Sequence, residues 1–299
     1  MEWKELYKIV VEDLKERKSK STARGYITDL KAFNFIDKPN RADIRKKRRE
    51  WQKQGISGKT ILHRFSAVKW VLKNYPLEFS NDSVRDMLAE MSSRNVTVVH
   101  KTAEYATKEM TDTIIKNSDA RTGLCVAMMY YAGLRVSEVA RSKLSDWDIH
   151  GERPESNGRA CLYIPAESTI KDELDLTKTK EARVIPIILP LMRAFNRYVN
   201  GMRKEQGNYE GLILGVRGEV CVRSIWRMVS IACKENGYDN LHDHSFRHGL
   251  ATRLAKANIN AQQIAHIMGH KSIQTTMRYI HLNVSDSRNA INTAMSTDI

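Results

Sequence analysis

Residues 241–283 read LHDHSFRHGLATRLAKANINAQQIAHIMGHKSIQTTMRYIHLN and contain six of the nine histidines of the chain. A helix that begins near Asp243 places His244 and Arg247 on one face, because residues three apart are neighbours on a helix surface. We expect this polar pair to face away from the core. The opposite, apolar face of the helix carries Phe246, Leu250 and Leu254.

Two shorter helices are predicted after it. One begins at an Asn260 cap and ends at Gly269, the residue type that commonly closes a helix, and His270 follows directly. The next opens at Ser272 and carries Tyr279. Histidines, an arginine and a tyrosine gathered in this way can hold a phosphodiester and attack it, since arginine binds phosphate oxygens and tyrosine can form a covalent intermediate.

The order His244-x-x-Arg247-His248, Gly269-His270 and Tyr279 resembles the carboxy-terminal signature of the tyrosine recombinases, the phage integrase and Xer group. That family has an earlier arginine in a Gly-Leu-Arg-x-Ser-Glu context. Residues 132–139, AGLRVSEV, supply it as Arg135, with Glu138 three residues later.

The family also has a lysine on a β-hairpin, eight residues before a proline that ends a strand. Lys178 stands in this relation to Pro186 within TKTKEARVIP, residues 177–186. Lys171 and Lys180 are close enough in sequence to leave the choice of lysine open, because hairpin register is uncertain by a residue or two.

The resemblance implies DNA cleavage by Tyr279, which would give a 3′-phosphotyrosine and a free 5′-hydroxyl without ATP, cofactor or metal. It implies that Arg135 and Arg247 stabilise the charge of the transition state. His270 would add a hydrogen bond to a phosphate oxygen, and Lys178 would protonate the leaving oxygen. His244 would assist proton movement at the tyrosine, and Glu138 would orient Arg135 or His244. From geometry, we expect a structural role for His248.

The fold class expected is mainly α with a small antiparallel β-sheet, arranged as a two-domain DNA clamp. Residues 1–94 are predicted to form a helical core-binding domain and residues 105–299 an α+β catalytic domain that ends in a tail at 282–299. Residues 95–104 are interpreted as a linker, with a short strand as the alternative. The predicted helices span 2–18, 21–35, 41–54, 57–75, 81–93, 107–117, 121–132, 189–205 and 222–236, and the strands 161–165 and 176–186.

The charge favours an anionic partner. The formal net charge is +14 and the pI about 9.6. Residues 1–94 hold 22 lysines and arginines against 13 acidic residues, so most of the excess lies in the first domain. The densest basic run of this domain is Arg45-Lys46-Lys47-Arg48-Arg49, and its alternative interpretation is a solvated helix face. The candidates for DNA-backbone contact are Arg45, Lys46, Lys47, Arg48, Lys59, Arg64, Lys69 and Lys73.

Several other classes fit the sequence poorly. No apolar run approaches the roughly 20 residues of a membrane span, and the charged amino terminus is no signal peptide. The four cysteines form no Cys-x-x-Cys pair, which favours reduced thiols in a cytoplasmic protein. Gly55–Thr60 lacks the spacing of a phosphate-binding loop, and neither the histidine cluster nor Asp146-x-Asp148 has the partners of a metal site.

The resemblance further implies double-stranded DNA with inverted half-sites as partner, a homodimer on each site and a homotetramer in synapsis. We expect a core site without accessory arm sites, used by a mobile-element integrase or a chromosome-dimer resolvase. Two alternatives stay open at this point. One is a type IB topoisomerase, which nicks and reseals as a monomer, and the other is a non-catalytic DNA-binding relative.

Overall fold

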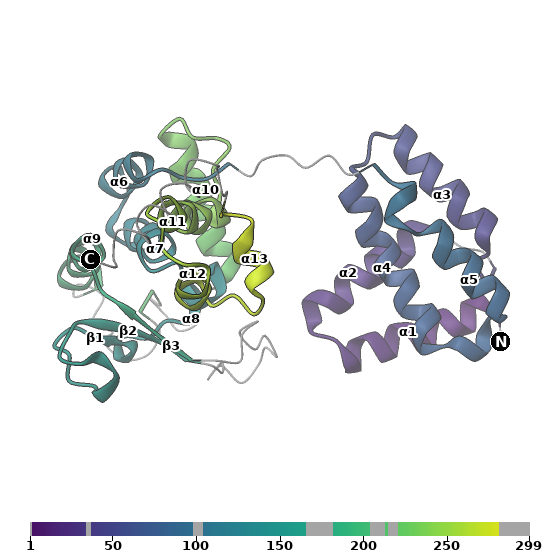
Figure 1. Cartoon of the computed structure of the whole chain (residues 1–299), viewed down its shortest axis with the longest axis horizontal. Helices are drawn as coiled ribbons and strands as arrows, with labels where there is room; N and C mark the ends of the chain where they lie inside the picture. The colour runs from purple at the N-terminus through teal and green to yellow at the C-terminus, as the bar shows by residue number, and fades with distance from the viewer. Residues whose placement is uncertain are drawn as a thin grey trace, which may run out of the picture. The chain divides into compact units, whose positions relative to one another are not determined.

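A computed structural model describes residues 2–33, 37–97, 104–165, 182–203, 213–214 and 221–280. The chain divides into two compact units, residues 1–102 and 103–299, each with its own hydrophobic core (Figure 1). Among the described residues, no helix has both the length and the apolar character to cross a bilayer.

The first unit is helical throughout its described part. Caps fix the helix starts: the Asn40 side chain accepts hydrogen bonds from the first turn of its helix, and the hydroxyls of Ser57 and Ser80 do the same. The bounds agree closely with the predicted helices. They are α1 (Trp3–Arg17), α2 (Lys20–Phe33), α3 (Arg41–Lys53), α4 (Gly58–Asn74) and α5 (Asn81–Glu90), with 3-10 turns at Pro76–Glu78 and Ser93–Asn95.

An aromatic cluster closes the core of this unit. The rings of Phe33 and Trp51 lie 4.8 Å apart between centroids, and Phe65 lies 6.1 Å from Phe33. Val96 is also buried in this core, and the Asn95 side chain donates to two carbonyls of α5. The first residues of the expected linker therefore pack on the first unit.

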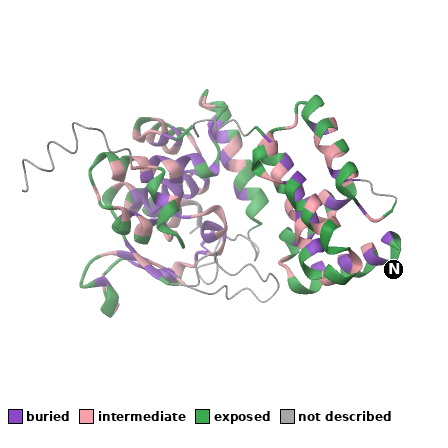
Figure 2. Ribbon diagram, turned by 45° about the vertical axis from the view of Figure 1, so that its right-hand side comes forward, coloured by how far each residue is buried: buried purple, intermediate pink, exposed green. Residues whose placement is uncertain are grey.

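The second unit is built around α7, whose residues are buried from Thr122 to Tyr131 because α6, α9, α10 and α11 pack against it (Figures 1 and 2). A helix enclosed in this way is apolar on all sides, as its sequence is. The helices are α6 (Lys108–Asn117), α7 (Ala120–Tyr131), α8 (Val136–Arg141), α9 (Leu189–Arg197), α10 (Val222–Glu235), α11 (Asp243–Lys256), α12 (Ala261–Met268) and α13 (Ile273–Met277), with a π-helical turn at Tyr198–Arg203 and 3-10 turns at Leu144–Asp146 and Pro154–Ser156.

A three-stranded antiparallel sheet lies beside these helices, in the order β1 (Trp147–Asp148), β2 (Cys161–Ile164) and β3 (Arg183–Pro186). The register pairs Ile164 with Arg183, the first residue of β3. The fold class, mainly α with a small antiparallel sheet, is confirmed. Strand β1 escaped prediction because two residues give no alternation to detect. The predicted start of the last strand, residues 176–181, lies outside the described residues.

Candidate active site

The turn between α7 and α8 positions Arg135. Gly133 has φ +64°, a conformation that glycine adopts without strain, and this turn places Arg135 at the N-cap of α8. The Arg135 amide donates to Oε2 of Glu138 (2.8 Å), and its Nη1 donates to Oε1 (2.9 Å). The spacing of three in the Gly-Leu-Arg-x-Ser-Glu motif thus makes a capping interaction that also fixes the arginine side chain.

The carboxyl end of α12 holds both predicted arginines. Gly269 ends this helix with φ +56°, and the carbonyls of Met268 and Gly269 are left without helical partners. Arg247 donates through Nη2 to Met268, and Arg135 donates through Nη2 to Gly269 at 2.7 Å. The negative end of the helix dipole favours both cations. Two consecutive carbonyls therefore set the two guanidinium groups side by side, one residue before His270.

Arg247 is buried, so the expectation that it faces away from the core is wrong. Only 5% of the residue is exposed, and Nη1 donates to the carbonyl of Gly133. The reason is that α12 packs against α11 through Ala251, Ile264 and Met268, which covers the face assigned to solvent. The His244 side chain, at the start of α11, remains mostly exposed.

Positive charge is in excess around these arginines. Burial, together with the neighbouring Arg135 guanidinium, lowers the pKa of Arg247 to about 9, and Arg183 acts in the same direction. Glu138 opposes the shift without cancelling it. Three guanidinium groups around one carboxylate form a site that an anion would stabilise.

Arg183 is a member of this cluster that the sequence did not suggest. Its side chain is 3% exposed and makes two parallel bonds to Glu138, Nη1 to Oε1 at 3.0 Å and Nη2 to Oε2 at 2.7 Å. Burial disfavours the carboxylate, but the hydrogen bonds and charge of Arg183, with the Arg135 amide, hold the pKa of Glu138 at about 2. In the sequence, Arg183 stands before Val-Ile-Pro within a predicted strand, and this context does not indicate Glu138 as its partner.

Tyr279 follows α13 and is half-buried. Its amide donates to Thr276 (2.9 Å), and its hydroxyl is hydrogen-bonded to Nδ1 of His248. His248 was expected to be structural, whereas His244 was expected to move the proton of the tyrosine. Among the described contacts, none joins His244 to the hydroxyl; its ring lies 6.3 Å from that of His248.

Two partly buried histidines of the site, His248 and His270, have lowered pKa values. Burial, then the positive charges of Arg247 and Arg135, lower the pKa of His270 to about 4, and its Nδ1 lies 2.8 Å from the Thr276 hydroxyl. Burial, then the charges of His244 and Arg247, lower the pKa of His248 to about 4. Burial raises the pKa of Tyr279, opposed by Arg278 and Arg247. The tyrosine is therefore protonated near pH 7, beside an imidazole able to accept its hydrogen bond.

Two parts of the predicted site lie outside the described residues, namely Lys178 with its alternatives Lys171 and Lys180, and the tail 282–299. The other candidates are all placed. Hydrogen bonds connect Arg135, Glu138, Arg247 and the end of α12, while Tyr279 packs partly buried against Met268 and its neighbours. The roles given to these residues by the resemblance stay predictions.

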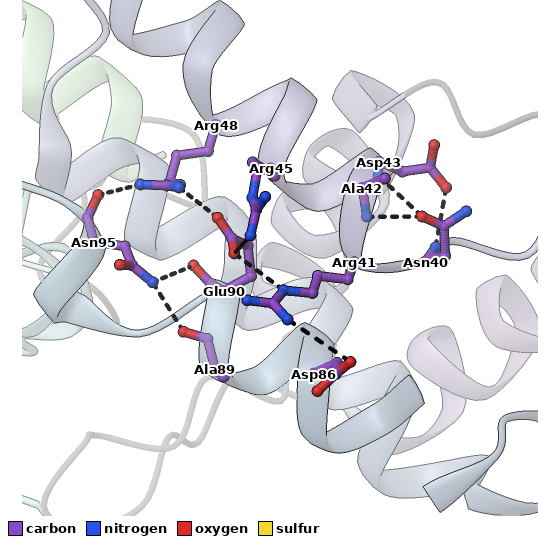
Figure 3. A network of polar contacts seen from close by, with 10 residues as sticks. All are labelled: Asn40, Arg41, Ala42, Asp43, Arg45, Arg48, Asp86, Ala89, Glu90 and Asn95. Carbon is purple, nitrogen blue, oxygen red and sulfur yellow. Dashed lines mark hydrogen bonds and ion pairs between the residues drawn. The ribbon is translucent and has the colours of Figure 1, made fainter. Parts of the chain in front are cut away.

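The basic run of the first unit divides between two faces of α3. Arg45 and Arg48 turn toward Glu90 of α5, with Nη2 of Arg45 3.3 Å from Oε2, and Arg48 also donates to the carbonyl of Asn95 (2.7 Å; Figure 3). Among the other candidates, Lys46, Lys59 and Lys73 are exposed, and Lys47, Arg64 and Lys69 are half-buried. Arg45 and Arg48 are therefore held by protein groups, whereas Lys46 is open to solvent.

Residues 101–286 match the Phage integrase family. The chain is 26% identical over 294 residues to the tyrosine recombinase XerC of Corynebacterium glutamicum, which covers 94% of this chain and 88% of that protein. The fold is similar to that of the Tn1549 transposon integrase in complex with circular intermediate DNA (TM-score 0.76, 18% identity, 98% and 100% coverage). It is also similar to lambda integrase in a tetramer bound to a Holliday junction (TM-score 0.66, 16% identity, 91% and 78% coverage).

Proposed function

Because the chain belongs to the phage integrase family, we propose that it is a site-specific tyrosine recombinase that cuts and rejoins DNA through Tyr279. The observation that carries this proposal is the end of α12, where adjacent carbonyls hold Arg135 and Arg247 in a cluster with excess positive charge. A phosphodiester is the anion that such a pair of guanidinium groups binds best. Tyr279 packs against the cluster that joins α11 to α12, formed by Ala251, Ile264 and Met268.

In the proposed cleavage step, the Tyr279 oxygen attacks phosphorus and the bond to the 5′-oxygen breaks. The product is a 3′-phosphotyrosine, and the leaving oxygen takes a proton from Lys178, which the resemblance assigns to this task. Arg135 and Arg247 stabilise the added negative charge, an effect worth about 10² to 10³ in rate for one such donor. Attack by a 5′-hydroxyl on the phosphotyrosine reverses the step and releases Tyr279.

Contacts of the tyrosine support a revised assignment for its proton. His248 is hydrogen-bonded to the hydroxyl and, with its lowered pKa, accepts that bond in the neutral form. We propose that His248 orients the hydroxyl and receives the proton as the bond to phosphorus forms. His244, at the exposed start of α11, would then contact the DNA phosphate, and His270 would donate to a phosphate oxygen through the nitrogen not used by Thr276.

The proposed partner is double-stranded DNA with inverted half-sites, bound by one dimer per site and by a tetramer in synapsis. Lambda integrase was solved as a dimer bound to a core site and as a tetramer bound to a Holliday junction, and its fold is similar to that of this chain. Residues 1–94 would grip the duplex as the core-binding domain, with 105–299 as the catalytic domain. The tail 282–299 would contact a neighbouring protomer. Use by a mobile element is proposed from the fold similarity to a transposon integrase.

Covalent capture tests this function. A pool of nicked duplexes with randomised half-sites is incubated with wild type or Tyr279→Phe in EDTA, and protein-linked DNA is recovered under denaturing conditions. We expect linked DNA from wild type alone, with a shared inverted repeat in the recovered sequences. A wild-type protein that binds a defined duplex but never becomes linked to it would contradict the proposal. Linkage without sequence preference would instead favour a topoisomerase.

A further inference from the structure

Arg183 lies beneath Arg135 and contacts the groups that hold it. The Arg135 guanidinium donates to two acceptors: Nη1 donates to the Glu138 carboxylate, and Nη2 donates to the Gly269 carbonyl. Arg183 binds both oxygens of the first acceptor. It also lies against the residue that carries the second, because a methyl group placed on the Gly269 Cα would lie 2.7 Å from Nη1 of Arg183. One buried side chain therefore supports both anchors.

The burial and the partners of Arg183 together separate its role from those of Arg135 and Arg247. Its side chain is 3% exposed, against 18% for Arg135, and its Nε has no hydrogen-bond partner among the described residues. Both terminal nitrogens of Arg183 are bonded to the Glu138 carboxylate, which balances its charge, whereas Arg247, which is equally buried, donates only to backbone carbonyls and keeps an unbalanced charge for a phosphate. The position of Arg183 is strictly defined, because two parallel bonds to a carboxylate fix the plane of a guanidinium group.

The pairing of β3 with β2 and the packing of α12 position the backbone of Arg183. Arg183 opens β3 opposite Ile164, and α12 packs against β3. Glu138 would be costly to bury with Arg135 alone, since Arg135 shares its guanidinium with the Gly269 carbonyl. Arg183 supplies the missing compensation and sets the angle at which Glu138 meets Arg135.

We infer that Arg183 is a positioning residue of the recombination site, one that aims the Arg135 guanidinium by fixing Glu138 and the backbone at Gly269. This inference rests on the proposed function. It assigns to the sheet a part in catalysis, because the strand carries a residue that acts through Arg135 without touching DNA. Such a residue affects the rate of cleavage more than it affects the binding of the duplex.

The test is a double-mutant cycle on cleavage of a duplex recovered by covalent capture with wild type. We expect Arg183→Gln to lower the single-turnover rate about 10²-fold, with DNA affinity changed by less than about threefold. In an Arg135→Lys background, we expect Arg183→Gln to lower the cleavage rate by less than about a further threefold, because the guanidinium that Arg183 positions is already gone. Arg183→Lys keeps the positive charge but lacks the two parallel N–H donors of a guanidinium group, so we expect a cleavage rate between those of wild type and Arg183→Gln. Effects that multiply in the double variant would overturn the inference.

A matched control separates this effect from the loss of any arginine near the sheet. Arg153→Gln removes a guanidinium that stacks on Tyr163 of β2, with 5.0 Å to the ring centroid, and that has no contact with the described residues of the site. We expect its cleavage rate to equal that of wild type. If Arg183→Gln does not fold, as judged by its thermal unfolding, Arg183→Lys carries the cycle. A rate for the folded Arg183 variant equal to that of Arg153→Gln would overturn the inference.

A second substrate identifies the route of the effect. Replacing the bridging 5′-oxygen by sulfur gives a thiolate leaving group that departs without a proton, so it rescues defects of the general acid. Loss of phosphate stabilisation by Arg135 is not rescued in this way, and we expect the Arg183 defect to persist. Rescue by sulfur would assign the effect to leaving-group protonation and overturn the inference. Failure of the wild type to form any covalent product would instead contradict the proposed function itself.

Discussion

In the described part of each unit a buried glutamate binds arginines, and the two clusters are built differently. In the first unit, Glu90 on α5 meets Arg41, Arg45 and Arg48 from one face of α3 (Figure 3). The Arg41 and Arg45 side chains are 50% and 43% exposed. In the second unit, Arg183 is enclosed at Glu138, and the neighbouring Arg247 donates to backbone carbonyls.

The difference shows what a carboxylate and its arginines can contribute. Around Glu90, Arg41 and Arg45 reach water and only Arg48 is largely enclosed, so most of the charge is screened and the cluster mainly joins α3 to α5. Around Glu138, Arg183 and the neighbouring Arg247 are shielded from water, where charges interact strongly and excess positive charge favours the binding of an anion. A glutamate surrounded by arginines does not mark an active site; arginines enclosed and held beside a nucleophile do.

Glu138→Ala tests the enclosed cluster and should have the largest effect. Removing the carboxylate leaves Arg183 buried and unpaired, which typically costs about 3–5 kcal/mol of unfolding free energy. Arg135 loses its orientation as well, so the cleavage rate should fall at least about 10²-fold. Urea unfolding and single-turnover cleavage measure the two effects.

Glu138→Gln is the control for shape. It keeps an acceptor for Arg183 but removes the charge, and its stability should lie between those of wild type and the alanine variant. If Glu138→Ala were as stable as wild type, water would have replaced the carboxylate as the partner of Arg183. The contrast between the two clusters would then fail.

Glu90→Ala makes the corresponding change in the first unit and should have a smaller effect. Arg41 and Arg45 can turn to solvent and Arg48 keeps its bond to the Asn95 carbonyl, so we expect a loss of about 1 kcal/mol in unfolding free energy. The cleavage rate on a duplex at saturating protein should stay at the wild-type value. A fall in this rate as large as that of Glu138→Ala would mean that the Glu90 cluster also takes part in the reaction.

The sequence predicted most of the helices, because caps and apolar periodicity are local; the site residues came from the family resemblance, and their roles stay predictions. Asn260 and Gly269 bounded α12 as expected, and Arg135 met Glu138 at the expected spacing. The partners of Arg183 and Arg48 could not be foreseen. Each joins residues more than 40 positions apart, and only the packing of one element on another brings them together. The burial of Arg247 was missed for the same reason, since helical periodicity does not show a second helix packed over a polar face.

The two faces of α3 predict a smaller effect, on the salt dependence of DNA binding. Lys46 and Arg49 are exposed, while Arg48 is tied to Glu90 and Asn95. If the exposed face contacts phosphates, Lys46→Ala and Arg49→Ala should each reduce the slope of log affinity against log salt by about 0.9. Arg48→Ala should leave the slope unchanged and lower stability instead. A slope change from Arg48→Ala alone would reverse the assignment of the two faces.

The last prediction concerns the acid sensitivity that the partly buried histidines of the second unit confer. The pKa values of His248 and His270 are lowered to about 4, so in the folded protein both stay neutral at pH values where the unfolded chain, with a histidine pKa of about 6.5, takes up protons. The unfolded state then binds more protons, and stability is lost as pH falls from about 6.5 toward about 4. Changing both residues to glutamine should reduce this loss, measured as the change in urea midpoint between about pH 7 and about pH 5. The carboxylates titrate alike in both proteins and cancel in the comparison, so equal losses would mean that these histidines are protonated in the free site.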